Sequence, residues 1–99
     1  MAVKILIKRK FKEGSIRAAS RFIINHRNGA MRQPGYISSE TMRNIDDPDT
    51  VLVVSTWHSL EDWEAWKNSE TRRANEEEFK DYIVAQAELE HYSLGLPLE

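Results

Sequence analysis

Apolar and polar residues alternate along residues 2–9, at the start of the chain. The apolar side carries Val3, Ile5 and Ile7, and Lys4 and Lys8 lie on the other side, with Leu6 as the exception. This period of two residues is typical of a strand with one buried face. After a turn at "KEGS", apolar side chains recur at helical spacing. They are Ile16, Ala19, Phe22 and Ile23. Their stripe predicts a helix that begins after Ser15.

Two further extended runs follow the turn residues Pro34 and Gly35. The first is expected from Tyr36 to about Asn44, and strict alternation would place Tyr36 and Ser38 on the same face. The second run, "TVLVVSTWH", is the most β-branched of the chain and predicts a central strand, with Trp57 on an apolar face. The intervening "DDPD" predicts a turn.

The rest of the chain predicts a second helix in two pieces and a closing strand. Ser59 is expected to cap the first piece, with Asp62 completing a near capping box. A bend is expected near Ser69, after which Phe79 gives the charged second piece an apolar edge. Apolar and polar residues alternate again over residues 85–94, which predicts the last strand.

The predicted order of elements fits a single domain of residues 1–99. Strand, helix, strand, strand, helix and strand in succession are typical of an α+β, ferredoxin-like (split βαβ) fold. In that fold a four-stranded antiparallel sheet carries its helices on one face. The third strand has apolar residues on both faces, so the uncovered sheet face would remain partly apolar. Two such sheets packed face to face would bury it, which predicts a homodimer.

Composition narrows the classes of function. The net charge of −2 and the pI of about 5.9 argue against a nucleic-acid partner, which normally demands a basic surface. The absence of cysteine excludes a disulfide framework, a thiol nucleophile and thiolate metal ligands, and it suits the cytoplasm. The apolar run at the N-terminus is too short for a signal-peptide core or a membrane span, so no membrane association is expected. No function is assigned to Leu98 and Glu99, which could be native or could derive from a cloning site.

The stretch "RQPGYISSETMRNIDDPDTVLVVSTWHSLEDWEAWKNSETRRA" resembles the antibiotic biosynthesis monooxygenase superfamily of dimeric α+β barrels. The likeness begins with Pro34 and Gly35 before the second strand and the Asp-Pro turn before the third. It continues with Trp57 at the end of the third strand and "SLEDWEAWKNSE" at the start of the next helix. The predicted order of elements agrees along nearly the whole chain. The resemblance is specific for the fold and much less specific for the activity.

This resemblance implies a pocket between sheet and helices that holds a hydrophobic ring substrate, such as an anthrone or a quinol. In oxygenases of the superfamily the substrate is deprotonated, and its own anion reduces dioxygen without metal or flavin. Trp66 lies where the haem-degrading branch also has a tryptophan. That branch has an iron-ligating histidine on the next helical stretch, where this chain has Asn75 or Glu76, and an asparagine on the first strand, near Ile7. The standard haem ligand positions are therefore not matched, and no cofactor is expected.

The candidate site residues combine this resemblance with the predicted apolar faces. His26 and Asn75 are the candidate catalytic residues, because His26 can exchange a proton near neutral pH and can face inward beside Ile23. The candidate substrate-binding residues are Trp66, Tyr36, Ser38, Trp57 and Phe79. For Trp57, core or dimer packing is the favoured role, and core packing is the simpler account of Trp63, whereas Trp66 is the ring expected to stack on a ligand.

Other polar residues are expected to have ordinary structural roles. His58 is expected to make only a backbone contact at a strand–helix junction. Because His26, His58 and His91 lie on separate elements without a metal-binding spacing, no metal site is expected. The arginines of the first helix and the run Glu76 to Glu78 are expected on solvated surfaces.

Three functions remain open from the sequence. The favoured one is a cofactor-independent monooxygenase, a cytoplasmic homodimer that uses dioxygen on a quinol- or anthrone-like aromatic substrate. The second is a non-catalytic module of the same fold that holds haem or another flat hydrophobic ligand. The third is an interaction protein whose sheet face serves only dimerisation.

Overall fold

The computed structural model describes residues 1–96, and Leu98 and Glu99 lie outside the described residues. The elements are β1 (Val3–Lys10), α1 (Ile16–Met31), β2 (Tyr36–Arg43), β3 (Thr50–Trp57), α2 (Leu60–Lys67), α3 (Glu70–Glu78), the short 3₁₀ helix η1 (Lys80–Tyr82) and β4 (Glu88–Ser93). Their order is the predicted one, and all three strand pairings are antiparallel. The predicted α+β, ferredoxin-like fold class is confirmed.

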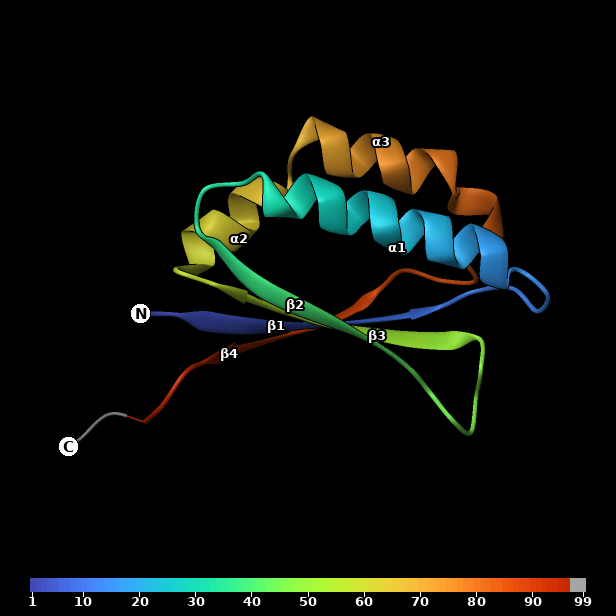
Figure 1. Ribbon diagram of the computed structural model, residues 1–99, viewed down its shortest axis with the longest axis horizontal. Helices are drawn as coiled ribbons and strands as arrows, with labels where there is room; N and C mark the ends of the chain where they lie inside the picture. The colour runs from blue at the N-terminus through green and yellow to red at the C-terminus, as the bar shows by residue number, and fades with distance from the viewer. Residues whose placement is uncertain (97–99) are drawn as a thin grey trace.

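The strand order in the sheet is β2-β3-β1-β4, which places β1 and β3 at the centre. Val3 lies opposite Trp57 and Ile7 lies opposite Val53, so the apolar sides of the two central strands share one face. Figure 1 shows all the helices on one side of the sheet, with α1 running across it and α3 beside α1. Helices and sheet thus form two layers, and the core lies between them.

The core consists of two clusters. The first contains the three tryptophans, the inward residues of β1 and one alanine of α1: Val3, Ile5, Ile7, Ala30, Trp57, Trp63 and Trp66. The second contains Phe11, Ala19, Phe22, Val51 and Phe79. The prediction that Trp57 and Trp63 are core residues is confirmed, since they are 0% and 1% exposed.

Local capping signals position the helices of the C-terminal half. The Asp62 amide donates to the Ser59 hydroxyl oxygen at 3.1 Å, which confirms the expected cap of α2. The chain bends where predicted, and the Arg72 amide donates to the Ser69 hydroxyl oxygen at 3.2 Å at the start of α3. Ser15 also precedes its helix as expected, but its side chain makes no cap hydrogen bond.

The register of β2 differs from the prediction. A bulge between Tyr36 and Ser38 shifts the alternation, so that Tyr36 shares a face with Ser39. The hydroxyl groups of Tyr36 and Ser39 are 2.7 Å apart. Ser38 instead lies opposite Thr56, on the sheet face away from the helices. The prediction that Ser38 lies beside Tyr36 on one face is therefore wrong, because a bulge adds a residue to one strand that strict alternation does not anticipate.

The sheet face away from the helices carries apolar side chains, as expected. Leu6, Leu52 and Val54 of the central strands are partly exposed there. On the flanking strands Met42 is 44% and Tyr92 is 51% exposed. The homodimer that would cover this face stays a prediction. Within residues 1–96 the helices are too short or too polar to cross a membrane.

Candidate functional site

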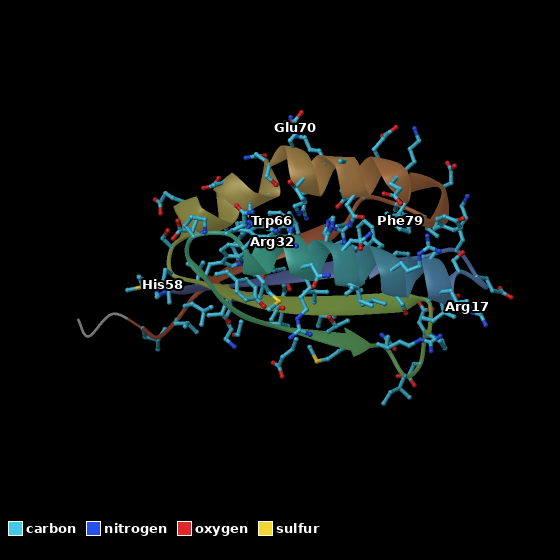
Figure 2. The ribbon with its side chains drawn as sticks, turned by 45° about the horizontal axis from the view of Figure 1, so that its top comes forward. Arg17, Arg32, His58, Trp66, Glu70 and Phe79 are labelled. Atoms are coloured by element: carbon cyan, nitrogen blue, oxygen red, sulfur yellow. The ribbon has the colours of Figure 1, made fainter. Side chains whose placement is uncertain are left out.

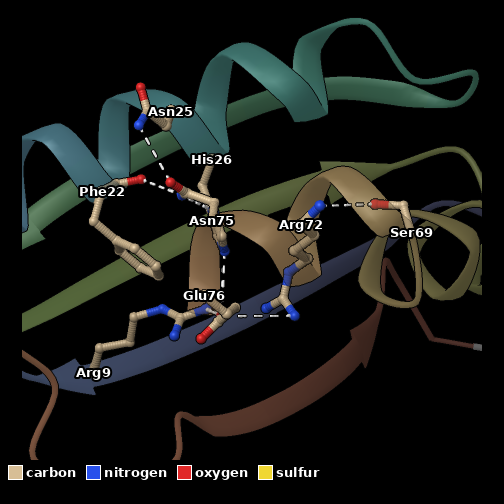
Figure 3. A network of polar contacts seen from close by, with 8 residues as sticks. All are labelled: Arg9, Phe22, Asn25, His26, Ser69, Arg72, Asn75 and Glu76. Atoms are coloured by element: carbon tan, nitrogen blue, oxygen red, sulfur yellow. Dashed lines mark hydrogen bonds and ion pairs between the residues drawn. The ribbon is translucent and has the colours of Figure 1, made fainter. Parts of the chain in front are cut away.

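A cluster of charged and amide side chains lies where α1, α3 and β1 meet (Figure 3). Arg9 belongs to β1, His26 to α1, and Arg72, Asn75 and Glu76 to α3. Arg9 and Asn75 are only 3% and 8% exposed. Arg9 points inward because it continues the alternation of the buried side of β1. The three α3 residues share one side of their helix because residues three and four positions apart are neighbours on a helix surface.

Asn75 determines how His26 is protonated. The Asn75 amide nitrogen donates to the backbone oxygen of Phe22 at 3.0 Å, and this contact fixes the amide's orientation because a carbonyl only accepts. The same nitrogen donates to Nδ1 of His26. Nδ1 is therefore unprotonated, and neutral His26 carries its hydrogen on Nε2. That Nε2–H donates to Oε1 of Glu76 at 3.2 Å.

His26 and Glu76 are both shifted away from the protonated form. Burial lowers the pKa of His26 below 6.5, and its hydrogen bond to Glu76 offsets only part of that effect. Burial by itself would raise the pKa of Glu76, but the hydrogen bond from His26 and the charge of Arg9 outweigh it and lower that pKa to about 2. At neutral pH the pair is therefore a neutral imidazole hydrogen-bonded to a carboxylate.

Two guanidinium groups share the single carboxylate of Glu76. Nη2 of Arg9 donates to it at 2.6 Å, whereas Nη1 of Arg72 remains 3.9 Å away. Within the described chain, the buried Nε of Arg72 has no hydrogen-bond partner. Burial, with the charge of Arg9, lowers the pKa of Arg72 to about 10. The cluster therefore holds more positive than negative charge at a site largely removed from solvent.

A cavity between α1 and the sheet adjoins this cluster, and we call it the aromatic pocket. Its walls include Tyr36, Trp57 and Trp66, and the two arginines of the cluster also line it. The cavity volume is about 40 Å³, which is room for a few water molecules. With the open space at its mouth, the unfilled volume reaches about 470 Å³. A ring ligand would therefore occupy the mouth as well as the inner space.

A second and larger cavity lies between α3 and β4, and we call it the α3–β4 cleft. Its volume is about 540 Å³. Arg9 and Arg72 line it as well, so the two arginines stand between the aromatic pocket and this cleft. Figure 3 shows both guanidinium groups reaching toward Glu76, with β4 passing below them.

The structure brings most of the predicted site residues together. His26, Trp66, Tyr36 and Trp57 all line the aromatic pocket, and Asn75 contacts His26 directly. Trp66 is 3% exposed and packs so closely against α1 that a Cβ at Gly29 would lie 2.5 Å from its ring.

Ser38, Phe79 and His58 lie outside this assembly. Ser38 is on the opposite face of the sheet, and its neighbour Ser39 lines the pocket instead. Phe79 packs in the second core cluster against Phe22, with ring centroids 5.7 Å apart, and lies toward the far end of the helical layer from Trp66 (Figure 2). The His58 amide donates to the Gly35 carbonyl at 2.8 Å, which confirms its expected backbone contact.

The sequence interpretation missed Arg9, Arg72 and Glu76. Glu76 was expected on a solvated helix surface, which is wrong because it bridges three buried or half-buried partners. Two signals were available. Arg9 continues the apolar side of β1, and Arg72 and Glu76 have the spacing of an ion pair on one helix face.

The sequence model of the antibiotic biosynthesis monooxygenase family matches residues 3–85. The chain belongs to this family. No curated protein sequence matches it. Among solved structures it is similar to SnoaB, a cofactor-independent oxygenase from Streptomyces nogalater, with a TM-score of 0.83 and 11% identity over 98% of this chain and 96% of that chain.

The fold is also similar to two further solved structures. A protein from Nitrosomonas europaea that bears the family's name gives a TM-score of 0.83 at 14% identity over 92% of this chain and 88% of that chain. Rv0793 from Mycobacterium tuberculosis gives 0.83 at 7% identity over the full length of both chains. At such identities these likenesses establish the fold and not the activity.

The residues of this family member do not fit a haem iron. Asn75 stands where the resemblance to haem-degrading relatives would require a ligating histidine, and its amide is already bonded to Phe22 and His26. Both ring nitrogens of His26 are also engaged. Over residues 1–96, no group of His, Cys, Asp and Glu side chains is arranged to hold a metal ion. A haem iron could therefore gain an axial ligand at this site only by displacing one of the two contacts of His26.

Proposed function

We propose that this family member is a cofactor-independent monooxygenase that acts with dioxygen on a hydrophobic aromatic substrate, such as a quinol or an anthrone. The observation that carries the proposal is the surplus of buried positive charge at the aromatic pocket. Arg9 and Arg72 both line that pocket, while Glu76 is the one carboxylate they share. Buried cations stabilise an anion much more strongly than cations in water do. The pocket therefore favours the ionised form of a ring substrate.

Ionisation is the step that makes such a substrate reactive toward dioxygen. An anthrone loses a proton from its CH₂ carbon, and the anion donates electrons to dioxygen as a C–O bond forms at that carbon. Cleavage of the O–O bond, with loss of the second hydrogen from the carbon, then gives the quinone carbonyl and water. The sum is CH₂ + O₂ → C=O + H₂O. All electrons come from the substrate, so no external reductant is required.

The aromatic residues of the pocket serve to hold the ring. Trp66 and Trp57 offer apolar ring surface, and Tyr36 adds a hydroxyl group that is bonded to Ser39. Aromatic walls of this kind bind flat ligands through buried area and offset or edge-on stacking. Arg27 and Thr41 are exposed lining residues, which places the mouth of the pocket between α1 and β2.

His26 is the proposed proton acceptor. Its Nδ1 holds the free lone pair of the neutral ring, and the Asn75 amide now donates to it, so substrate binding must replace that contact. After protonation at Nδ1, the Nε2–H would pair an imidazolium with the Glu76 carboxylate. A carboxylate partner of this kind orients a catalytic histidine and stabilises its charged form.

The family assignment and the structural likeness to SnoaB, described as a cofactor-independent oxygenase, support this proposal. We also propose that the protein works as a homodimer in the cytoplasm. The partly exposed apolar side chains on the sheet face away from the helices support the dimer, because a second copy would remove them from water.

The test is oxygen uptake by the metal-free protein with a panel of anthrones and hydroquinones. We expect uptake above the spontaneous rate for at least one of them and a large loss in Arg72→Gln. The matched control is Arg73→Gln, which removes the neighbouring, exposed arginine of the same helix. Equal activity in both variants would contradict the role of the buried charge.

The same experiment separates the oxygenase from a binding module. Saturable binding of the ring compounds without uptake, weakened in Trp66→Phe while the dimer persists, would instead identify a non-catalytic module for flat ligands. Haem is included in that titration as a ligand that the site geometry disfavours.

A further inference from the structure

We propose that the α3–β4 cleft is a second ligand site, one that takes a small amphipathic carboxylate. The cleft is distinct from the aromatic pocket because its own lining comes from α2, α3, η1 and β4. At about 540 Å³ it is within the range of cavities that hold small organic ligands, whereas the aromatic pocket is much smaller. This proposal does not depend on oxygenase activity.

The charges that face the cleft favour an anion. Its lining contains Arg9, Lys67, Arg72 and Lys80 against one carboxylate, that of Glu76. Lys80 is exposed and paired with Glu77 at 2.6 Å, so it contributes little. Lys67 is half-buried and makes no ion pair within residues 1–96, apart from any contact of the last three residues. A ligand between Lys67 and Arg72 therefore meets positive charge that Glu76 does not neutralise.

Arg72 has an unmet need for a hydrogen-bond acceptor. Its side chain is 10% exposed, its contact with Glu76 is 3.9 Å long, and its buried Nε–H has no partner in the described chain. A buried donor without a partner costs free energy that a suitable acceptor recovers. A carboxylate suits the position beside Arg72 because its two oxygens can accept hydrogen bonds from the planar fork of a guanidinium.

The opposite wall of the cleft is apolar. Ile83, Ala85, Ala87 and Leu89 line it, from the segment that leads into β4 and from β4 itself, and Gln86 is its one polar lining residue. A ligand with a hydrocarbon or ring portion would lie against this wall while its carboxylate lies between Arg72 and Lys67. The pairing of one cationic wall with one apolar wall distinguishes this ligand class from inorganic phosphate, which would leave the apolar wall in water.

The test compares 2-naphthoate with its methyl ester by isothermal titration calorimetry of the wild-type protein. The two probes have similar apolar surface, but only the acid carries the charge. We expect naphthoate to bind at least tenfold more tightly, with an affinity that falls as salt is added, because the cations of the cleft are partly exposed. In Lys67→Gln the affinity for naphthoate should fall about fivefold, the scale of one partly exposed ion pair, and the affinity for the ester should not change.

Lys12→Gln is the matched control, because Lys12 is exposed and lies outside the cleft lining. Equal binding of acid and ester, no detectable binding of naphthoate at millimolar concentration, or equal affinities in Lys67→Gln and Lys12→Gln would each overturn the proposal. If naphthoate binds but none of the anthrones and hydroquinones supports oxygen uptake, the ligand site in the cleft stands and only the proposed oxygenase activity is contradicted. If an anthrone or hydroquinone supports oxygen uptake but naphthoate does not bind, the oxygenase proposal stands and the ligand site in the cleft is contradicted.

Discussion

Replacing Glu76 with glutamine removes the one negative charge that holds the buried cluster together. The pKa of Glu76 falls from its usual 4.5 to about 2, so its ionised form stabilises the folded state by at most about 3 kcal/mol. Because the side chain is 33% exposed, solvent screens part of this interaction, and about 2 kcal/mol is the better expectation. Glu76→Gln should therefore lower the free energy of unfolding at pH 7 by about 2 kcal/mol.

The effect of this change has a specific dependence on pH. A depressed pKa in the folded state means that the stabilisation is complete above about pH 4.5 and is lost as the pH falls toward 2. The difference between wild type and Glu76→Gln should therefore be constant from pH 7 to 5 and shrink below that. Urea unfolding at a series of pH values and one fixed protein concentration measures it.

Glu78→Gln provides the control for this experiment, because Glu78 is exposed on the same helix. It should change the free energy of unfolding by no more than about 0.5 kcal/mol. Equal losses of stability in the two variants at pH 7 would contradict this role of Glu76. An unchanged deficit of Glu76→Gln at pH 3 would contradict it as well, because at that pH the Glu76 carboxyl is already protonated in the unfolded chain while it is still largely ionised in the folded protein.

Three further substitutions or conditions have defined outcomes. Arg72→Met should raise the free energy of unfolding by about 1 kcal/mol, because it replaces a buried charge that lacks hydrogen-bond partners by an apolar side chain, and it should abolish oxygen uptake. A lower melting temperature than that of the wild type would contradict this. Gly29→Ala should lower the free energy of unfolding by about 1–2 kcal/mol and impair ring binding, because its Cβ would push Trp66 aside and this overpacking outweighs the gain in helix propensity. Asn28→Ala, at the exposed neighbouring position, is the control in thermal melts and should not lower the melting temperature. The rate of uptake should decline as the pH falls through the lowered pKa of His26, below 6.5, and a profile that stays level there would exclude His26 as the proton acceptor.

The elements of the fold were predictable because each has a strong local signal. The alternation in β1, the β-branched run of β3 and the cap residue Ser59 all act within a few neighbouring residues, so their effects are visible in the sequence itself. The bulge in β2 escaped prediction because it depends on how two strands pair. That single irregularity replaced Ser38 by Ser39 at the pocket.

The candidate site was predictable only in part. Asn75 and Trp66 were identified from the family resemblance and His26 from its helical spacing to Ile23, and the three residues do lie close together. The network that surrounds them was not, because Arg9 and Glu76 are separated by most of the chain and meet only after β1 and α3 pack. Individual charges also look alike in sequence, and burial alone distinguishes Arg72 from its solvated neighbour Arg73.

In the proposed function, buried positive charge at the aromatic pocket promotes oxygenation of an ionised ring. The most direct measurement is the oxygen-uptake rate of metal-free wild type, Arg72→Gln and Arg73→Gln with an anthrone, each verified as folded by circular dichroism. We expect uptake by wild type and Arg73→Gln, at rates within about twofold of each other, and a loss of at least tenfold in folded Arg72→Gln, the scale of one charge-stabilising group. Equal rates in the two variants, or an anthrone turned over no faster than it oxidises spontaneously while bound at the pocket, would contradict it.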